Sequence, residues 1–512
     1  MTPNRDPENK REREAAGGGR EVRDRLASLR EDRHAARLAS PTGEGQAGSP
    51  ECGAMVAIQV QLDGDRVQAA SFQAYGCPAT LACAAEAVRL VEGRTLFEAA
   101  LVGERTLVEA LSLPEDKWSR AGLAVDALHA ALGQALVRTA RCESTPQGVL
   151  VGMSGGVDSN VAALLLKQNG YRPVGATLKL WTATEEGRRN MCCSDEAVRR
   201  ARRIAHQLGI PHFTLDARDL FFTSVVQYFI DEYAAGRTPN PCVKCNARLR
   251  FGLLATTARR LGLSRIATGH YARLTGNPPR LSRALCLPKD QSYVVAEVAP
   301  ELLEITLFPL GELDKSTVRE LAREAGLEGH DAPESQEICF VPEEGHRAFL
   351  RQHIGARPGM LVDTAGRTLG QHTGTYNFTV GQRRGHGVAA PHPLYVIRID
   401  PTRDEVVLGP RDQLAVMEIV LKDAVVHRPN APAQGLVQTR SSGQVVPGVA
   451  TWHKDQVVIR LTRPAFGVAP GQTGVLYHSD DVVLAGTIIE TRGSQTTSLV
   501  DTAANHRREH LR

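Results

Sequence analysis

The sequence predicts an α/β protein whose main domain is a doubly wound parallel sheet, preceded by a small α+β domain and followed by β-rich domains. Between about residues 148 and 350, apolar strands and helices alternate, as in Val174–Leu178 followed by Glu196–Leu208. This alternation is typical of a parallel sheet with helices on both faces. After about residue 355, short β-type runs separated by Gly and Pro indicate a β-rich central domain and a C-terminal barrel.

Two segments precede the alternating region. Residues 1–48 are rich in Arg, Glu, Gly and Ala and contain few large apolar residues, so we expect a disordered charged tail. Beyond this tail, alternating apolar residues reach Asp63-Gly64, and Val67–Ala74 form a second extended run. This pattern is typical of a β-hairpin. The helices expected after the hairpin cover Ala79–Leu90 and Gly122–Leu136.

Length and composition are typical of a cytoplasmic multidomain enzyme. A chain of 512 residues has room for about three to four domains. No apolar run approaches the roughly 18 residues of a membrane span, and the polar N-terminus lacks the apolar core of a signal peptide. The ten cysteines fit a reducing compartment better than a disulfide framework. The net charge of +4 does not by itself indicate a nucleic-acid-binding protein.

The most informative stretch is the glycine-rich turn in Val149-Leu-Val-Gly-Met-Ser-Gly-Gly-Val-Asp-Ser159. An apolar strand precedes the turn and a helix follows it, so backbone N–H groups and the positive end of the helix dipole face the turn. The two glycines allow close approach of a ligand, and Ser154 and Ser159 add hydroxyl groups. The turn therefore predicts a phosphate-binding site at the carboxyl ends of the strands, where Thr268-Gly-His270 also lies.

Cysteines in two later strings indicate sulfur chemistry. Thr238-Pro-Asn-Pro-Cys-Val-Lys-Cys-Asn246 holds a C-x-x-C pair, Cys242 and Cys245, and Ser335-Gln-Glu-Ile-Cys-Phe340 holds Cys339. The thiolate is the reactive form of cysteine, so we expect a nearby cation such as Lys244, or a bound phosphate, to tune these thiols.

These strings together resemble the bacterial tRNA-specific 2-thiouridylases of the MnmA family, which are N-type ATP pyrophosphatases. The resemblance covers about residues 148–495 and includes further strings in the family's order: Ala267-Thr-Gly-His-Tyr-Ala272, Lys289-Asp-Gln-Ser-Tyr293, Phe308-Pro-Leu-Gly311, Phe378-Thr-Val-Gly-Gln-Arg-Arg-Gly385 and Ala469-Pro-Gly-Gln472.

The resemblance implies ATP-dependent 2-thiolation of the wobble uridine in tRNA. ATP, with Mg²⁺, would adenylate the C2 oxygen of uracil and make it a leaving group. Asp158 would act in catalysis as a partner of Mg²⁺. The residues that match the family's ATP site are Gly152, Met153, Ser154, Gly155, Gly156, Val157, Asp158, Ser159, Leu178 and Gly269.

The resemblance also assigns the sulfur and tRNA sites. Cys339 matches the carrier of the persulfide, and Cys245 matches the nucleophile that cleaves it through a transient disulfide. The sulfur donor would be a cysteine desulfurase or a sulfur-relay protein. The target base must leave its stack to expose C2. Residues matching the family's contacts with this base and with the tRNA, including its anticodon arm, are Asn240, Pro241, Cys242, Lys289, Asp290, Gln291 and Arg440.

Residues 50–140 resemble the IscU/NifU-type iron-sulfur scaffold, through Cys52-Gly53, Phe72-Gln-Ala-Tyr-Gly-Cys77 and Gly93-Arg-Thr-Leu-Phe-Glu98. The family's Asp after Cys-Gly is Ala54 here, and its His-Cys pair is Ser119-Arg120. Only Cys52 and Cys77 remain as matching ligands, whereas a cluster requires about four. We expect a docking platform for a cysteine desulfurase first, ahead of a two-cysteine sulfur relay or an inert remnant.

Three alternatives remain open. Many MnmA relatives have Asp at the position of Cys242, so Cys242, Cys245 and Cys339 could together hold a 4Fe-4S cluster for a cluster-dependent thiolation. We expect the persulfide route. An iron-sulfur or sulfur carrier protein would leave the ATP loop unexplained, and a synthetase or amidotransferase would not require the cysteines.

The expected domains are a disordered tail (1–48), an IscU/NifU-like domain (50–140), an ATP pyrophosphatase domain (148–350), a central β-rich domain (355–415), a C-terminal β-barrel (416–495) and a second tail (496–512).

Overall fold

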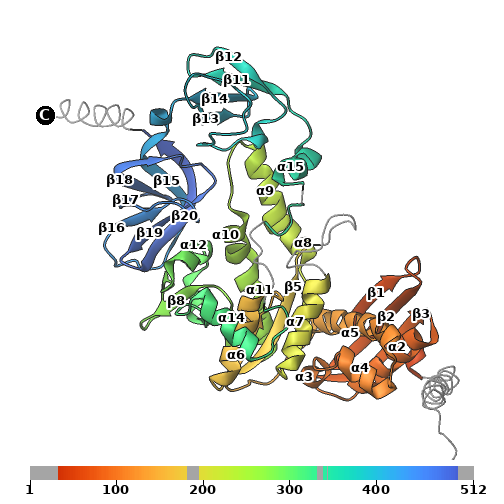
Figure 1. Ribbon diagram of the computed structural model, residues 1–512. Coiled ribbons are helices and arrows are strands. Elements are labelled where there is room, and N and C mark those ends of the chain that lie inside the picture. The colour runs from red at the N-terminus through yellow and green to blue at the C-terminus, as the bar shows by residue number, and fades with distance from the viewer. Residues whose placement is uncertain (1–32, 182–194, 331–337, 343, 494–512) are drawn as a thin grey trace, which may run out of the picture.

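The computed structural model describes residues 33–181, 195–330, 338–342 and 344–493. Figure 1 shows the N-terminal domain on one side of the central sheet and the two β-rich domains on the other. None of the described helices is long and apolar enough to cross a membrane. Most of the two predicted tails lies outside the described residues.

The N-terminal domain is an antiparallel three-stranded sheet with helices packed on one face. Alternate residues of the second strand, from Val56 to Leu62, are buried beneath these helices, as the hairpin pattern predicts. The elements are β1 (Gly43–Ser49), β2 (Ala54–Asp63), β3 (Arg66–Tyr75), α2 (Pro78–Val91), α3 (Leu96–Ala99), α4 (Glu104–Leu111) and α5 (Trp118–Arg138), with short 3₁₀ turns η2 (Arg33–Ala35) and η3 (Glu115–Lys117).

Strand β1 corrects the predicted extent of the N-terminal tail. Gly43–Ser49, assigned to that tail up to residue 48, pairs with β2 along its full length. The strand contains no large apolar residue, so it gives no hydrophobic pattern. Its glycines instead allow close packing, because a Cβ atom at Gly43 would lie 2.1 Å from the carbonyl oxygen of Ala131 in α5.

The catalytic domain contains the predicted parallel sheet, in the order β10-β7-β4-β5-β6. Chain order reverses between β4 and β7, which makes this gap the switch point where ligands bind in such sheets. One face is covered by α6, α7 and α14, and the other by α11. The strands are β4 (Gly148–Gly152), β5 (Arg172–Lys179), β6 (His212–Asp216), β7 (Arg265–Thr268) and β10 (Thr306–Leu307); the helices are α6 (Val157–Gln168), α7 (Asp195–Gln207), α11 (Phe251–Arg260), α12 (Ser292–Val295), α13 (Pro300–Glu304) and α14 (Lys315–Glu324).

Two helices of this domain contain a π-helical turn. The first runs through α8 (Arg218–Phe221), η4 (Phe222–Val226) and α9 (Gln227–Ala234) towards the central domain (Figure 1). The second runs through α10 (Pro241–Cys245) and η5 (Asn246–Arg250) into α11. Such π-turns are frequent at functional sites.

Both β-rich regions are present. The central one has the strand order β12-β11-β14-β13, and the last forms a six-stranded barrel because β15 pairs with both β18 and β20. The hairpin β8–β9 of the catalytic domain joins the barrel through Ser282 and Asp481. The elements are β8 (Ala272–Thr275), β9 (Arg280–Arg283), η6 (Leu287–Lys289), α15 (His346–Ile354), β11 (Gly359–Asp363), β12 (Thr368–His372), η7 (Thr375–Asn377), β13 (Tyr395–Asp400), β14 (Glu405–Gly409), η8 (Arg411–Leu414), β15 (Ala415–Val426), β16 (Gln434–Gln438), β17 (Val446–His453), β18 (Gln456–Phe466), β19 (Thr473–His478) and β20 (Asp481–Arg492).

Candidate active site

The glycine-rich turn forms a compact loop between β4 and α6. The Ser159 hydroxyl accepts a hydrogen bond from the backbone N–H of Ser154 (3.1 Å) and donates to the carbonyl oxygen of Gly156 (3.0 Å). Gly155 has φ +75°, and a Cβ atom there would lie 2.5 Å from the Ala197 carbonyl oxygen. The loop therefore requires glycine, and it holds the start of α6 open towards an anion.

A pocket lies beside this loop at the switch point of the sheet. Gly269 follows β7 and packs against the first turn of α6, where a Cβ atom would lie 2.7 Å from the Ser159 backbone nitrogen. The predicted ATP residues Gly152, Met153, Ser154 and Leu178 line the pocket, together with Ala176, Thr177, Leu180, Arg250, Leu254 and Thr268.

Asp158 lies at the edge of the loop and has two partners that the sequence did not reveal. The Tyr271 hydroxyl and the Lys315 ammonium both donate to its Oδ1, at 2.8 and 2.6 Å. Tyr271 belongs to the family-like string around His270, and Lys315 begins α14. A third of the Asp158 side chain remains exposed. The carboxylate is thus held from one side and open on the other.

The predicted tRNA-contacting segment 289–291 connects to this carboxylate. Gln291 accepts a hydrogen bond from the backbone N–H of Tyr271 (2.9 Å), and Asp290 accepts from the backbone N–H of Ala284 (2.9 Å). Lys289 is half-buried at the end of η6, whereas the neighbouring Leu285 and Leu287 are exposed. The loop is therefore shaped by Asp290 and Gln291, and its exposed surface includes apolar side chains.

His270 has a structural role in this arrangement. Its Nδ1 lies 2.8 Å from the Thr268 hydroxyl, and its ring stacks on Phe251. Burial, together with the charge of Arg250, lowers the pKa of His270 to about 3. The ring is therefore neutral at physiological pH.

The C-x-x-C pair is carried by α10, which begins in a capped turn. The Asn240 side chain accepts hydrogen bonds from the backbone N–H groups of Cys242 and Val243 (3.2 and 3.3 Å), and buried Pro241 occupies the first helical position. Cys242 is exposed and Cys245 is buried. Asn240 and Pro241 thereby position both cysteines.

Lys244, the cation expected to tune these thiols, has a carboxylate and a hydroxyl group as its partners. It is 4% exposed, its ammonium pairs with the buried carboxylate of Glu297, and it donates to the Thr487 hydroxyl (2.7 Å). Glu297 also accepts from Thr473 (2.8 Å). Since Thr473 and Thr487 belong to the barrel, Lys244 fixes α10 to the barrel, and its influence on the thiols stays a prediction.

Cys339 packs against the same hydrophobic core that contains Cys245. Its neighbour Phe340 is fully buried and contacts the rings of Phe229 and Phe349 edge to face, with centroids 5.2 and 5.5 Å apart. The aromatic cluster anchors the Cys339 segment beside α9 and α15. The preceding residues 331–337, including the acidic part of the Cys339 string, lie outside the described residues.

Comparisons with known proteins agree with this architecture. Four family models match consecutive parts of the chain: NifU-like N terminal domain (26–141), tRNA methyl transferase HUP domain (147–343), tRNA methyl transferase PRC-barrel domain (347–410) and Aminomethyltransferase beta-barrel domain (416–489). A Rubrobacter xylanophilus protein named "Bifunctional protein NifU/MnmA" is 44% identical over 90% of this chain and 96% of its own length. The chain belongs to this NifU/MnmA family.

Shorter relatives of the family match the chain without its N-terminal domain. Proteins named tRNA-specific 2-thiouridylase MnmA from Trichormus variabilis and Acidothermus cellulolyticus are each 42% identical over 67% of this chain and 98% of their own length. Among solved structures, the N-terminal part of a NifU-like protein from Brucella abortus aligns with 21% of this chain and 88% of its own, at 16% identity and a TM-score of 0.18.

The NifU-like domain retains two cysteines with different surroundings. Cys52 is exposed in the β1–β2 connection. Cys77 caps α2, and its sulfur lies 3.4 Å from the Thr80 hydroxyl. Burial raises the pKa of Cys77, but hydrogen bonds from Thr80 and Ala79 and the charge of Arg120 outweigh this effect, so the pKa lies below its ordinary value.

The candidate iron ligands do not form a metal site. Across residues 33–181, 195–330, 338–342 and 344–493, no group of three or more His, Cys, Asp or Glu side chains could hold a metal ion. This applies to Cys242, Cys245 and Cys339 and to the scaffold pair Cys52 and Cys77. Among the described thiols, the arrangement therefore includes no set that would hold an iron-sulfur cluster.

Arg440 contributes to the junction between the central domain and the barrel. Its guanidinium donates to the carbonyl oxygens of Val380 (3.2 Å) and Gly467, and burial lowers its pKa. Val380 belongs to the family-like string 378–385. The side chain predicted to contact tRNA thus shapes the surface where the two domains meet.

Proposed function

We propose that this enzyme catalyses ATP-dependent 2-thiolation of the wobble uridine in tRNA through a cysteine persulfide. The observation that carries the proposal is the phosphate cradle at the switch point, in a domain that also holds Cys245 and Cys339. The family models mention methyl transfer in their descriptions, but an ATP-type loop and two cysteines in the same domain favour sulfur transfer. The tRNA substrate indicates work in the cytoplasm.

Adenylation would occur at the glycine-rich loop. The backbone N–H groups from Ser154 to Ser159 and the N-terminus of α6 would hold the phosphates, with the adenosine in the pocket lined by Leu178. The uracil O2 atom attacks the α-phosphate and pyrophosphate leaves. When bound, Mg²⁺ would neutralise part of the negative charge of the phosphates. The open side of the Asp158 carboxylate would hold this ion through its water shell.

Sulfur transfer would follow at Cys339 and Cys245. The terminal sulfur of the Cys339 persulfide attacks C2, and AMP leaves with the former uracil oxygen. The Cys245 thiolate then attacks the Sγ atom of Cys339, which releases 2-thiouridine and leaves a Cys245–Cys339 disulfide for an external thiol to reduce. Cys245 is buried, whereas the half-buried Cys339 leaves the disulfide accessible to the external thiol. Mass spectrometry of tRNA nucleosides from a deletion strain, with and without the restored gene, tests the overall activity.

Substitution of Cys242 by Asp separates the persulfide route from a cluster route. Because the persulfide route uses only Cys245 and Cys339, and many relatives have Asp at this position, the Cys242→Asp variant should keep thiolation within about threefold of the original rate. The measurement is 2-thiouridine formation by anaerobically purified protein, with iron content determined in parallel.

A Cys245→Ser preparation is the matched control, since it removes the other cysteine of the same helix and should lose thiolation. A stoichiometric iron-sulfur cluster whose loss in Cys242→Asp abolishes thiolation would overturn the persulfide route.

We further propose that the NifU-like domain docks the cysteine desulfurase that donates sulfur. Docking requires a surface and not a thiol, so Cys77→Ser should retain its rate within about twofold, both with desulfurase plus cysteine and with free sulfide. Cys52→Ser, at the other cysteine of a two-cysteine relay, should likewise retain its rate. A loss with desulfurase but not with sulfide would contradict docking alone and establish a sulfur relay through the Cys77 thiolate.

A further inference from the structure

The NifU-like domain covers the free edge of the catalytic sheet. Strand β6 pairs with β5 on one side only, and its other edge faces α5 and the α3–α4 connection. The His212 backbone N–H donates to the Ala100 carbonyl oxygen (3.3 Å), and the His212 carbonyl oxygen lies 3.1 Å from Nδ1 of His129. A Cβ atom at Gly133 would lie 1.9 Å from the Thr214 carbonyl oxygen. The NifU-like domain thus provides partners for backbone N–H and carbonyl groups that an edge strand leaves unpaired.

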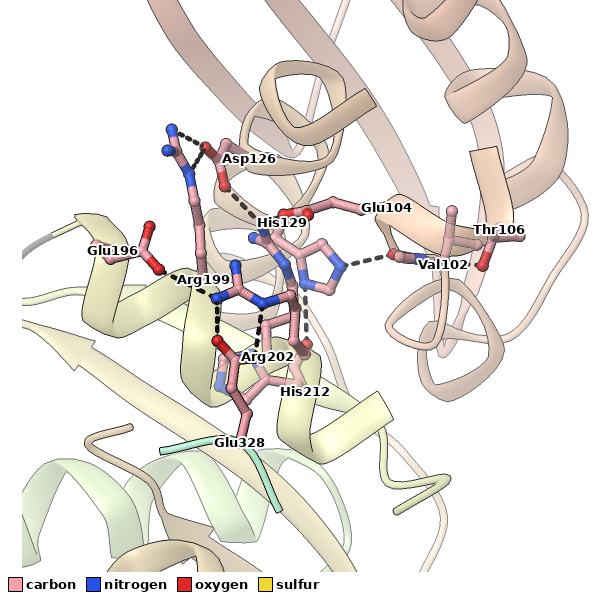
Figure 2. Close-up of polar contacts among 12 residues, drawn as sticks. Val102, Glu104, Thr106, Asp126, His129, Glu196, Arg199, Arg202, His212 and Glu328 are labelled. Atoms are coloured by element: carbon pink, nitrogen blue, oxygen red, sulfur yellow. Dashed lines mark hydrogen bonds and ion pairs between the residues drawn. The ribbon is translucent and has the colours of Figure 1, made fainter. Parts of the chain in front are cut away.

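A buried ion-pair cluster fixes this contact (Figure 2). Arg202 of α7 is 2% exposed and donates to Asp126 of α5 (2.7 Å), with Glu104 of α4 at 3.4 Å. Arg199, one turn earlier, pairs with the other oxygen of Asp126 (2.7 Å). Two carboxylates of the NifU-like domain thus compensate the charge of a guanidinium that is buried between the domains.

Two hydrogen bonds lead from this contact to the nucleotide pocket. The Thr177 hydroxyl donates to the Met153 carbonyl oxygen in the glycine-rich loop (2.8 Å) and lies 2.8 Å from Nε2 of His212. Because a hydroxyl has one proton, Nε2 of His212 must be the donor to Thr177. A chain of contacts thus runs from His129 through His212 and Thr177 to Met153, and both Thr177 and Met153 line the pocket.

We propose that docking of the NifU-like domain positions the ATP loop, with His212 and Thr177 as the positioning residues. Bound at the β6 edge, the domain fixes the His212 backbone. The His212 ring then orients Thr177, and Thr177 holds the Met153 carbonyl and hence the loop. This inference rests on the proposed binding of ATP at the loop. If the domain contact strengthens ATP binding, ATP binding must strengthen the domain contact by the same factor.

Two glycines of α5 provide a matched pair of variants. Gly133→Ala places a methyl group against the Thr214 carbonyl, whereas Gly122→Ala adds the same group at an ordinary contact distance of 3.5 Å from Glu104. We expect Gly133→Ala and Thr177→Val each to weaken ATP binding about three- to tenfold, the loss of one hydrogen bond, while Gly122→Ala and Thr177→Ser leave it unchanged. The measurement is the Kd of ATP for the full-length protein, with the Kd of tRNA as the readout that should not move.

The double variant decides whether the two effects share one route. If they do, Gly133→Ala combined with Thr177→Val binds ATP no more weakly than Thr177→Val alone. If the double variant instead shows the product of the two single losses in ATP affinity, the proposal is overturned. Unchanged ATP affinity in Gly133→Ala would overturn it as well.

Amide hydrogen exchange provides a test that does not require Gly133→Ala to fold. ATP should slow exchange of the His212 amide several-fold in the original protein but not in Thr177→Val. Equal protection in both proteins would refute the coupling. Absence of ATP binding by the original protein would instead contradict the proposed function, so the two failures are distinguishable.

Discussion

Substitution of Cys245 or Cys339 by Ser should reduce 2-thiouridine formation at least about 100-fold while pyrophosphate release from ATP continues. A serine hydroxyl neither carries a persulfide nor attacks sulfur at neutral pH, so the adenylated uridine forms but receives no sulfur. The measurement combines nucleoside mass spectrometry with a pyrophosphate assay on the same reaction mixtures, using tRNA and saturating desulfurase plus cysteine as the sulfur donor.

The matched control is Cys286→Ser, which replaces a half-buried cysteine in the same catalytic domain. It should keep both activities. A Cys339→Ser variant that still thiolates tRNA with desulfurase and cysteine would contradict the role of Cys339 as the persulfide carrier.

Substitution of Asp158 by Asn should reduce pyrophosphate release and thiolation together, by about 10²- to 10³-fold, while tRNA affinity stays within about threefold. The amide keeps the shape of the side chain but removes the negative charge that Lys315 and the Mg²⁺ water shell would share. Loss at the adenylation step distinguishes this variant from the cysteine variants, which lose only sulfur transfer.

Asp195→Asn is the control, because Asp195 begins α7 near the same loop but pairs with Lys179 at the surface. It should remain fully active. Normal pyrophosphate release by Asp158→Asn would contradict the assignment of Asp158 to the ATP site.

The main fold could be predicted from sequence because its signals are local. Alternating apolar residues in β2 and the apolar strand before the glycine-rich turn each report on a single element. Strand β1 escaped prediction because it packs through glycine, which has no hydrophobic signature. Its place in the sheet depends on α5, more than eighty residues away.

The candidate site was predicted where one string carries the chemistry and missed where distant residues meet. The residues of the loop from Gly152 to Ser159 lie together as expected. The contacts of Asp158 with Tyr271 and Lys315 span 113 and 157 residues, and no local pattern encodes them. The partners of Lys244 are of the same kind: the sequence places it beside Cys245 but does not show that its side chain reaches Glu297 and the barrel.

The bond between Lys244 and Thr487 has a consequence for the order in which the protein folds during synthesis. These partners lie 243 residues apart in the chain, so the ribosome needs roughly 10 to 50 seconds to make the second after the first. Over that interval the buried ammonium and Glu297 lack the hydroxyl groups of β19 and β20. The helix that carries Cys242 and Cys245 therefore reaches its final environment only when the last strand of the barrel is in place. The nascent enzyme completes its sulfur-transfer site last.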